Sequence, residues 1–123
     1  MGVHEMNKRT RKKWLKKHNK YVNPRECWNL DKRIAEFVLP RLKIYKKEAN
    51  CYPGRDEADT PEKWDAILDK MISAFEYILE DEEYWLKNYN YTQEQYKEKW
   101  IEKQESVSEG LHLFAEYFRD LWW

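Results

Sequence analysis

The sequence predicts an all-α fold, a three-helix bundle with a long C-terminal helix and a basic N-terminal arm. In three long segments, apolar residues recur at the i, i+3, i+4, i+7 spacing of one helix face. Side chains that cap helices stand at the start of each segment, and no segment alternates apolar and polar residues as a half-buried strand does. We expect helices at about 29–48, 60–87 and 92–121, within a single helical domain of residues 23–123.

The composition indicates one domain built around aromatic side chains. The chain has 123 residues, of which 37% are charged, and its mean hydropathy is −1.09. Such values are typical of disorder, but seven Trp, nine Tyr and four Phe provide the large apolar surfaces that disordered chains lack. No apolar run approaches the roughly 20 residues of a membrane span, so we expect a cytosolic chain with no membrane partner.

Residues 1–22 form the basic arm. They contain eight Lys or Arg and one acidic residue, so the arm carries a charge of +7 and residues 23–123 carry −7. Trp14 interrupts the cations, and a basic patch with interleaved aromatic residues is typical of nucleic-acid binding. The alternative is that the arm lies along the acid-rich stretch 76–83 of its own body. Because its own like charges repel one another, we expect the arm to be mobile.

The first predicted helix places Arg41 in the middle of its apolar face. On a projection of about 100° per residue, the apolar members of that face are Leu30, Ile34, Phe37, Val38, Ile44 and Tyr45. Burying an unpaired ion costs several kcal/mol, so Arg41 has to contact a carboxylate, backbone carbonyls or an anionic ligand. Pro40 removes one backbone hydrogen bond and predicts a kink that frees an acceptor beside Arg41.

Two interpretations of Arg41 remain open at this stage. In the structural one, Arg41 pairs with Glu48 or Glu82. In the functional one, its guanidinium grips a phosphate or carboxylate, a lysine adds charge, and an aromatic ring stacks on a flat ligand such as a purine nucleotide. The candidate ligand-binding residues are Arg41, Lys43, Lys70, Trp28, Tyr45 and Tyr52. This site implies no catalytic residue, metal ligand or cofactor.

The second and third helices have the clearest start signals. Thr60 is a helix cap and Pro61 suits the first helical position. Thr92 and Gln95 form a capping box for the third helix. Gly110 falls near the apolar face of that helix, where it weakens the helix by about 1 kcal/mol relative to Ala but lets another backbone approach closely. We therefore expect close helix packing at Gly110.

The chain ends in an apolar pair, Trp122 and Trp123. Such a pair is unfavourable in water, so we expect it to dock on the body or on a second copy, and we expect a homo-oligomer formed through the long third helix. Cys27 and Cys51 stand at opposite ends of the first helix. A helix of about 20 residues spans roughly 30 Å, which predicts two free thiols rather than a disulfide.

A magnesium-dependent nucleotide hydrolase is a further alternative. Glu80 with Glu83, and Glu102 with Glu105, resemble the carboxylate pairs by which all-α nucleotide pyrophosphohydrolases hold magnesium. These residues lie off the apolar faces, whereas catalytic carboxylates must converge on one interior site. The pattern therefore favours a solvated acidic surface.

Three stretches of the chain carry a family resemblance. The first stretch begins at Trp28 and contains WNLD and IAEFVLPRLK. The second begins at Trp64 and contains WD, ILDKMI and AFE. The third begins at Glu109 and contains EGL, LF, Tyr117 and LW. Together they resemble a family of small proteins of tailed bacteriophages, and the match covers most of residues 28–123. The resemblance implies a phage gene product that acts in the host cytoplasm.

By analogy of origin, that resemblance favours a counter-defence function. The function we expect first is non-catalytic binding, in which the chain sequesters a nucleotide-like small ligand. The alternative is an inhibitor that blocks a host protein or a nucleic acid through the basic arm and the surface aromatic residues.

Overall fold

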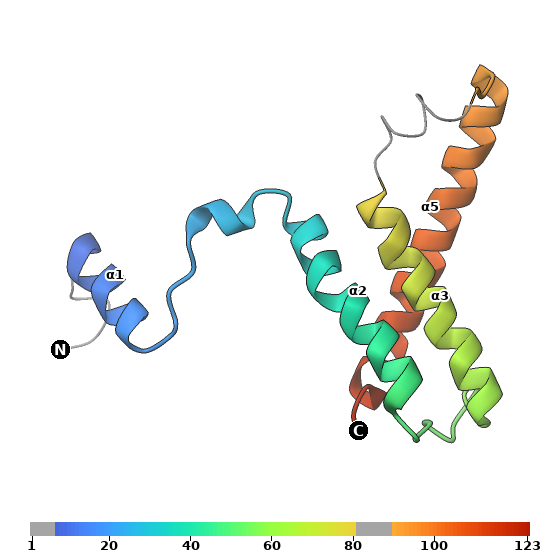
Figure 1. The fold of residues 1–123 in the computed structure, drawn as a ribbon, viewed down its shortest axis with the longest axis horizontal. Helices are drawn as coiled ribbons and strands as arrows, with labels where there is room; N and C mark the ends of the chain where they lie inside the picture. The colour runs from blue at the N-terminus through green and yellow to red at the C-terminus, as the bar shows by residue number, and fades with distance from the viewer. Residues whose placement is uncertain (1–6, 81–89) are drawn as a thin grey trace. The chain divides into compact units, whose positions relative to one another are not determined.

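The computed structural model describes residues 7–80 and 90–123. The elements, in chain order, are α1 (Lys8–Lys17), η2 (Pro24–Cys27), α2 (Leu30–Glu48), α3 (Pro61–Leu79), α5 (Gln93–Glu116) and η3 (Phe118–Asp120) (Figure 1). Within the described ranges there is no strand, and one isolated bridge joins Arg55 to Ala58. The predicted all-α class with a long C-terminal helix is confirmed.

The chain divides into two compact units, residues 1–30 and residues 31–123. In the first unit, Asn7 caps α1, and its Oδ1 accepts a hydrogen bond of 2.8 Å from the Thr10 N–H. The expected mobile arm thus contains a capped helix, because the cap satisfies an orphan donor and the last-turn lysines complement the helix dipole. The structure also groups residues 23–30 with this unit, beyond the end of the basic stretch.

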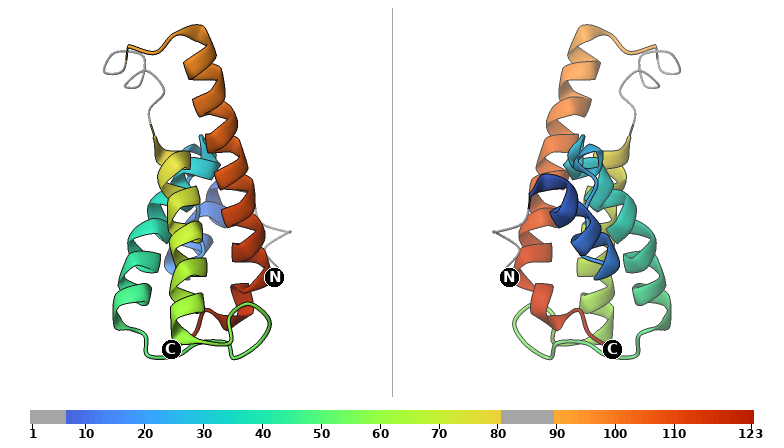
Figure 2. Two further views of the ribbon diagram at one scale, coloured as in Figure 1. Left: turned by 90° about the vertical axis from the view of Figure 1, so that its right-hand side faces the viewer. Right: turned by 90° about the vertical axis from the view of Figure 1, so that its left-hand side faces the viewer.

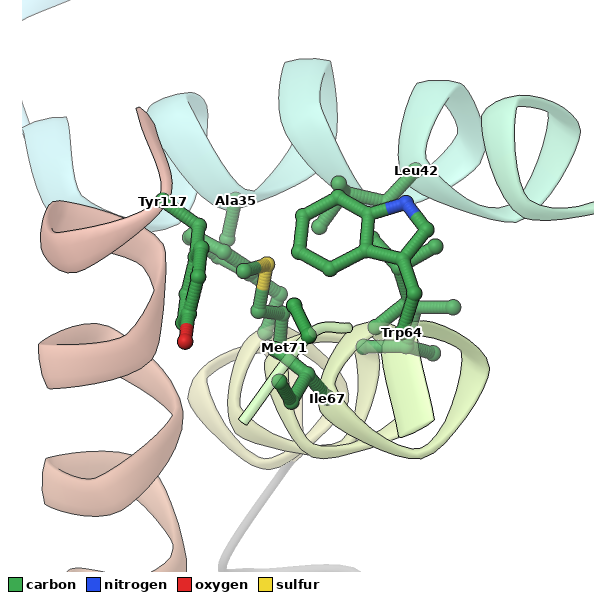
Figure 3. Packing of buried hydrophobic residues seen from close by; sticks show 10 residues of the cluster. Ala35, Leu42, Trp64, Ile67, Met71 and Tyr117 are labelled. Carbon is green, nitrogen blue, oxygen red and sulfur yellow. The ribbon is translucent and has the colours of Figure 1, made fainter. Parts of the chain in front are cut away.

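In the second unit, α3 lies between α2 and α5 (Figure 2). Thr60 caps α3 with its hydroxyl, and Pro61 occupies the first turn, as predicted. The residues that α3 buries are Trp64, Ile67, Leu68, Met71, Ile72, Ala74 and Phe75. Figure 3 shows Trp64 and Met71 in one cluster with Ala35 and Leu42 of α2 and with Tyr117. The core is therefore built on α3.

Helices α3 and α5 approach closely at Gly110, as predicted. A Cβ added at Gly110 would lie 2.5 Å from the Lys70 carbonyl oxygen and would overlap the Ala74 Cβ. Phe75 and Phe114 extend the same contact with their rings edge to face, 5.2 Å between centroids. Only a residue without a Cβ fits this crossing.

Two helix ends differ from the predicted ones. Helix α3 ends at Leu79, and Glu80 is extended; the predicted continuation to residue 87 falls on residues 81–87, which lie outside the described ranges. Helix α5 ends at Glu116 and is followed by the separate turn η3 rather than continuing to residue 121.

Helix α2 turns a different face to the core from the predicted one. Ala35 and Leu42 are buried, and Val38, Leu39 and Tyr45 are half-buried against the cluster. Most of the apolar face predicted to be buried is instead about half exposed. The exposed fractions are 51% for Leu30, 49% for Ile34, 60% for Phe37 and 58% for Ile44. The apolar residues of α2 cover a wide arc, and periodicity alone does not say which half of that arc meets α3.

The C-terminus is attached to the body through its backbone. The Tyr45 hydroxyl lies 3.1 Å from the Trp122 carbonyl oxygen, and the Cys51 thiol donates to the same oxygen at 3.1 Å. The two indole side chains remain exposed to solvent, Trp122 at 66% and Trp123 at 72%. Cys27 and Cys51 are free thiols, as predicted.

Arg55 joins the loop before α3 to the C-terminal turn of the chain by ion pairs. Its guanidinium contacts the carboxylates of Glu116 at 3.2 Å and Asp120 at 2.7 Å, and it lies over the Tyr117 ring. These carboxylates raise the pKa of Arg55 further above its ordinary value. The sequence reasoning did not single out Arg55, since Glu116 and Asp120 are about 60 residues away and its third acidic partner, Asp56, is its neighbour in the chain.

Candidate functional site

A basic concavity opens within the first unit. Its volume is about 680 Å³, and it lies between one face of α1 and the segment 21–25. The lining residues are Lys8, Arg11, Lys12, Leu15, Tyr21, Val22, Asn23, Pro24 and Arg25. The α1 members follow helical spacing, so a single face of the helix presents them. The lining contains four cations and no acidic side chain.

The segment 21–25 folds beside α1 because a second cap follows it. Asn23 and Glu26 form a reciprocal capping box at the start of η2, and Pro24 suits its first turn. The Glu26 carboxylate accepts a hydrogen bond from the Asn23 N–H at 3.2 Å, so it is engaged in the cap. This capping box is visible in the sequence, but it is not among the helix-start signals predicted above.

Aromatic rings are interleaved with the cations. The ammonium groups of Lys12 and Lys16 lie 5.2 and 5.1 Å from the centroid of the Tyr21 ring, and that of Lys20 lies 5.8 Å from the Trp14 ring. Within residues 7–80 and 90–123, none of the α1 cations has a carboxylate within ion-pair distance. The arrangement can therefore receive the anionic groups and flat rings of a ligand.

Arg41 occupies an exposed position on α2, so the prediction of a buried guanidinium is wrong. Its Nη1 donates to the Phe37 carbonyl oxygen at 2.9 Å, and its Cζ lies 3.8 Å from the centroid of the Phe37 ring. The described residues give Arg41 no ion pair with Glu48, and Glu82 lies outside them. Solvent and a backbone carbonyl replace the counter-charge that burial would have required.

A groove of about 270 Å³ lies beside Arg41, between α2 and the C-terminal part of the chain. Its lining residues are Phe37, Val38, Arg41, Leu42, Tyr45, Phe114, Phe118 and Leu121. We call it the α2–α5 groove. Arg41 is the only charged residue in the lining, and the Tyr45 hydroxyl is engaged with the C-terminal backbone.

The other candidate ligand-binding residues do not gather around Arg41. Lys43 points to α3 and pairs with Glu76 at 3.5 Å, because it lies about 200° from Arg41 around the helix. Lys70 pairs with Glu109 across the α3–α5 contact at 2.7 Å.

The predicted stacking aromatics are also distributed. Tyr45 lines the α2–α5 groove, whereas Tyr52 is 46% exposed in the loop after α2. Trp28 belongs to the first unit and is 69% exposed. Of the five candidates in the second unit, the structure brings only Arg41 and Tyr45 to one groove.

The carboxylates considered for magnesium show no convergence among the described residues. No group of three His, Cys, Asp or Glu side chains in these ranges could hold a metal ion. Burial raises the pKa of the Glu80 carboxyl, while the ammonium groups of Lys103 and Lys99 act in the opposite direction. Glu83 lies outside the described ranges.

Comparison with protein-family models, curated proteins and solved structures gives no significant match. In the described part of the chain, no helix combines the length and the apolarity needed to cross a bilayer. The relation to phage proteins stays a prediction.

Tyr45 provides a test of how the C-terminus is held. Burial and the hydrogen bond with the Cys51 thiol raise the pKa of Tyr45 to about 12. The folded state binds the phenol proton more tightly than the unfolded state, where the pKa is about 10, so this stabilisation is complete below pH 10 and declines from pH 10 to 12. For Tyr45→Phe we expect a free energy of unfolding about 1 kcal/mol lower at pH 8, and a smaller decline above pH 10.

Denaturant unfolding of the parent and of Tyr45→Phe between pH 8 and 11.5 measures both effects. The comparison isolates Tyr45, because the other titrating groups are common to the two proteins. An identical decline in both would contradict this role of the Tyr45 hydroxyl.

Proposed function

We propose that this chain is a non-catalytic binding protein that binds nucleic acid through its first unit. The observation that carries the proposal is the composition of α1 and its concavity. Seven of the ten residues of α1 are Lys or Arg, and a helix of this length extends about 15 Å. That charge density matches the phosphate spacing of a nucleic-acid backbone, where neutralised phosphates release condensed counterions.

The rings of the first unit favour single strands within this class. Tyr21 is half-buried at the concavity, and Trp14 stacks on His18 with 4.0 Å between ring centroids. Base stacking on aromatic side chains tolerates any sequence and adds to a cationic groove in single-strand binding. Because contacts between cations and phosphates carry no sequence information, we expect binding through the cations of α1 to show little sequence preference.

Nucleotide sequestration is the second candidate. One observation favours it: Arg41 borders the α2–α5 groove, where its guanidinium could meet a phosphate. The single cation of that lining supplies much less charge than the four cations that line the concavity of the first unit. In the cell of a phage host, either activity would suit a counter-defence protein.

The test is the salt dependence of binding to a fluorescent 20-nucleotide single strand. Lys8, Arg11, Lys12 and Arg25 are replaced together by Gln. At 100 mM salt we expect about a 100-fold loss of affinity, and a log–log salt slope that becomes shallower by about 1 for each cation that contacts phosphate.

The matched control replaces four exposed cations of the second unit by Gln, namely Lys32, Lys47, Lys97 and Arg119. We expect this control to keep most of the parental affinity, because its charges lie outside the first unit. Equal losses of affinity in the two variants would mean that binding depends only on the net charge of the chain and not on the first unit. Absence of binding by the parent at 50 mM salt would refute the proposal. A mononucleotide that binds the parent but not Arg41→Ala would favour the second candidate.

A further inference from the structure

An exposed row on α2 has the spacing of a helix-packing seam. The row consists of Ile34, Phe37, Arg41, Ile44 and Glu48, with steps of three and four residues. Its three apolar members are 49%, 60% and 58% exposed, respectively. This alternation of three and four is the a/d pattern by which one helix packs on another. A second helix could therefore cover the row.

A matching row borders the other side of the α2–α5 groove. It consists of Leu111 and Phe114 of α5, together with Phe118 and Leu121 of the C-terminal turn. Leu111 is 39% and Phe118 59% exposed, and the rings of Phe114 and Phe118 meet edge to face at 5.4 Å. The groove lies between these two rows, so the exposed apolar surface around the groove includes residues beyond those that line it.

The shape and lining of the groove favour a helix over a small polar ligand. Ile34 to Ile44 spans ten residues, about 15 Å, or roughly three helical turns. Along this length Arg41 is the only side chain in the lining that could bind an anion, because the Tyr45 hydroxyl contacts the C-terminal backbone. An amphipathic helix that places its apolar residues between two apolar rows is a recurrent mode of recognition.

Cations dominate the exposed side of α2. Arg33 and Arg41 are exposed on this side, and the described residues give neither of them an ion-pair partner. The acids on this side of α2 are Glu36, which lies away from the row, and Glu48 at its C-terminal end. An occupant would bury the Arg41 guanidinium, so it would have to supply a carboxylate.

The groove's other wall does not supply that carboxylate. Glu116 and Asp120 are the acids next to Phe118, and Arg55 contacts both, at 3.2 and 2.7 Å. Arg119, which follows Phe118 in the chain, is a further exposed cation. The groove is therefore apolar along its length and cationic beside it.

Pairing of α2 with α2 of a second copy matches these charges poorly. An antiparallel pair that aligns Ile34 with Ile44 sets Arg41 against Phe37 of the other copy. One that aligns Ile34 with Glu48 sets Arg41 against Arg41, and neither register places an acid opposite Arg41. The register that sets Arg41 against Glu48 aligns only residues 41–48 and leaves half of the row uncovered. A parallel pair sets Arg41 against Arg41, and like charges at a seam are unfavourable.

We infer that the α2–α5 groove binds an acidic amphipathic helix of a partner protein. Apolar side chains at heptad spacing enter the groove, and carboxylates beside them meet Arg41 and its neighbouring cations. This site lies in the second unit and does not depend on the nucleic-acid binding proposed for the first.

The test uses two synthetic helical peptides of about 18 residues, roughly 27 Å, with identical Leu and Ile at the seam positions. One peptide carries Glu beside the seam and the other carries Lys. Binding to the full chain is measured by fluorescence anisotropy. We expect the Glu peptide to bind at least ten times more tightly at 100 mM salt, because close opposite charges across an interface strengthen binding and like charges weaken it.

Variants locate the binding site on the chain. Phe37→Gln, at an exposed position, should weaken the Glu peptide at least tenfold, and Arg41→Glu should remove the preference for the Glu peptide. Lys32→Glu, on the opposite side of α2, is the matched control and should retain most of the affinity. The four-Gln variant of the first unit should also retain it, which excludes simple attraction to the basic helix.

Three results would overturn the inference. The first is equal binding of the two peptides by the parent. The second is that the four-Gln variant loses binding of the Glu peptide while Phe37→Gln binds it as tightly as the parent does. The third is a sedimentation profile in which the chain is a dimer that Phe37→Gln dissociates, which would assign the groove to a second copy.

Discussion

Gly110→Ala should lower the free energy of unfolding by about 3 kcal/mol, although the substitution raises helix propensity. At an exposed helix position the same change would stabilise the protein by about 1 kcal/mol. Here the new Cβ would lie 2.5 Å from the Lys70 carbonyl oxygen and would overlap the Ala74 Cβ. Neither atom belongs to a flexible side chain, so α3 and α5 would have to separate, and overpacking of this kind costs about 1–3 kcal/mol or more.

Urea unfolding followed by circular dichroism measures this loss. Gln104→Ala, at an exposed position on α5, is the matched control for helix propensity and should change stability by less than about 0.5 kcal/mol. Combining Gly110→Ala with Ala74→Gly should recover part of the loss, because one of the two overlaps is removed while the Lys70 carbonyl remains. A Gly110→Ala protein as stable as the parent would show that the helices do not meet at this position.

The sequence was sufficient to predict α3, since its apolar residues form one continuous face. Each of its buried residues falls on that face or next to it, and the Thr60 cap with Pro61 marks its start. The contact at Gly110 was also predictable, because a glycine near the apolar face of a long helix has few other uses. These features depend on local patterns, which a sequence displays directly.

Helix α2 was less predictable, because its apolar arc is wider than one contact can bury. Ala35 and Leu42 belong to the half that meets α3, while Phe37 and Ile44 belong to the half that stays exposed. Arg41 lies in the exposed half. A charge in the middle of an apolar row is compatible with a row that faces solvent and equally with a buried and paired ion, and only tertiary contacts decide between the two.

The basic site was predictable in composition but not in shape. The cations and the aromatic residues of α1 stand out in the sequence, whereas the concavity requires the segment 21–25 to fold beside the helix. That fold depends on the capping box of Asn23 and Glu26, a signal of four residues. Short caps have large effects on where a chain turns, and many sequences contain them without forming such a turn.

Trp64→Ala should lower the free energy of unfolding by about 3–5 kcal/mol, the usual cost of deleting a large buried aromatic side chain. Trp64 is 2% exposed and its ring meets Tyr117 edge to face at 5.5 Å. It lies in the cluster that joins α3 to α2 and to the C-terminal turn, so its removal leaves a cavity shared by all three (Figure 3). Trp64→Phe retains part of the ring contact and should lose less than Trp64→Ala.

Trp122→Ala is the matched control, since it deletes the same side chain at a position that is 66% exposed. Its backbone carbonyl, which receives the contacts of Tyr45 and Cys51, remains in the variant. We therefore expect a loss below about 1 kcal/mol, measured by urea unfolding at several protein concentrations. A loss as large as that of Trp64→Ala, growing with protein concentration, would mean that this indole is buried against a second copy, as the sequence alone predicts for a homo-oligomer.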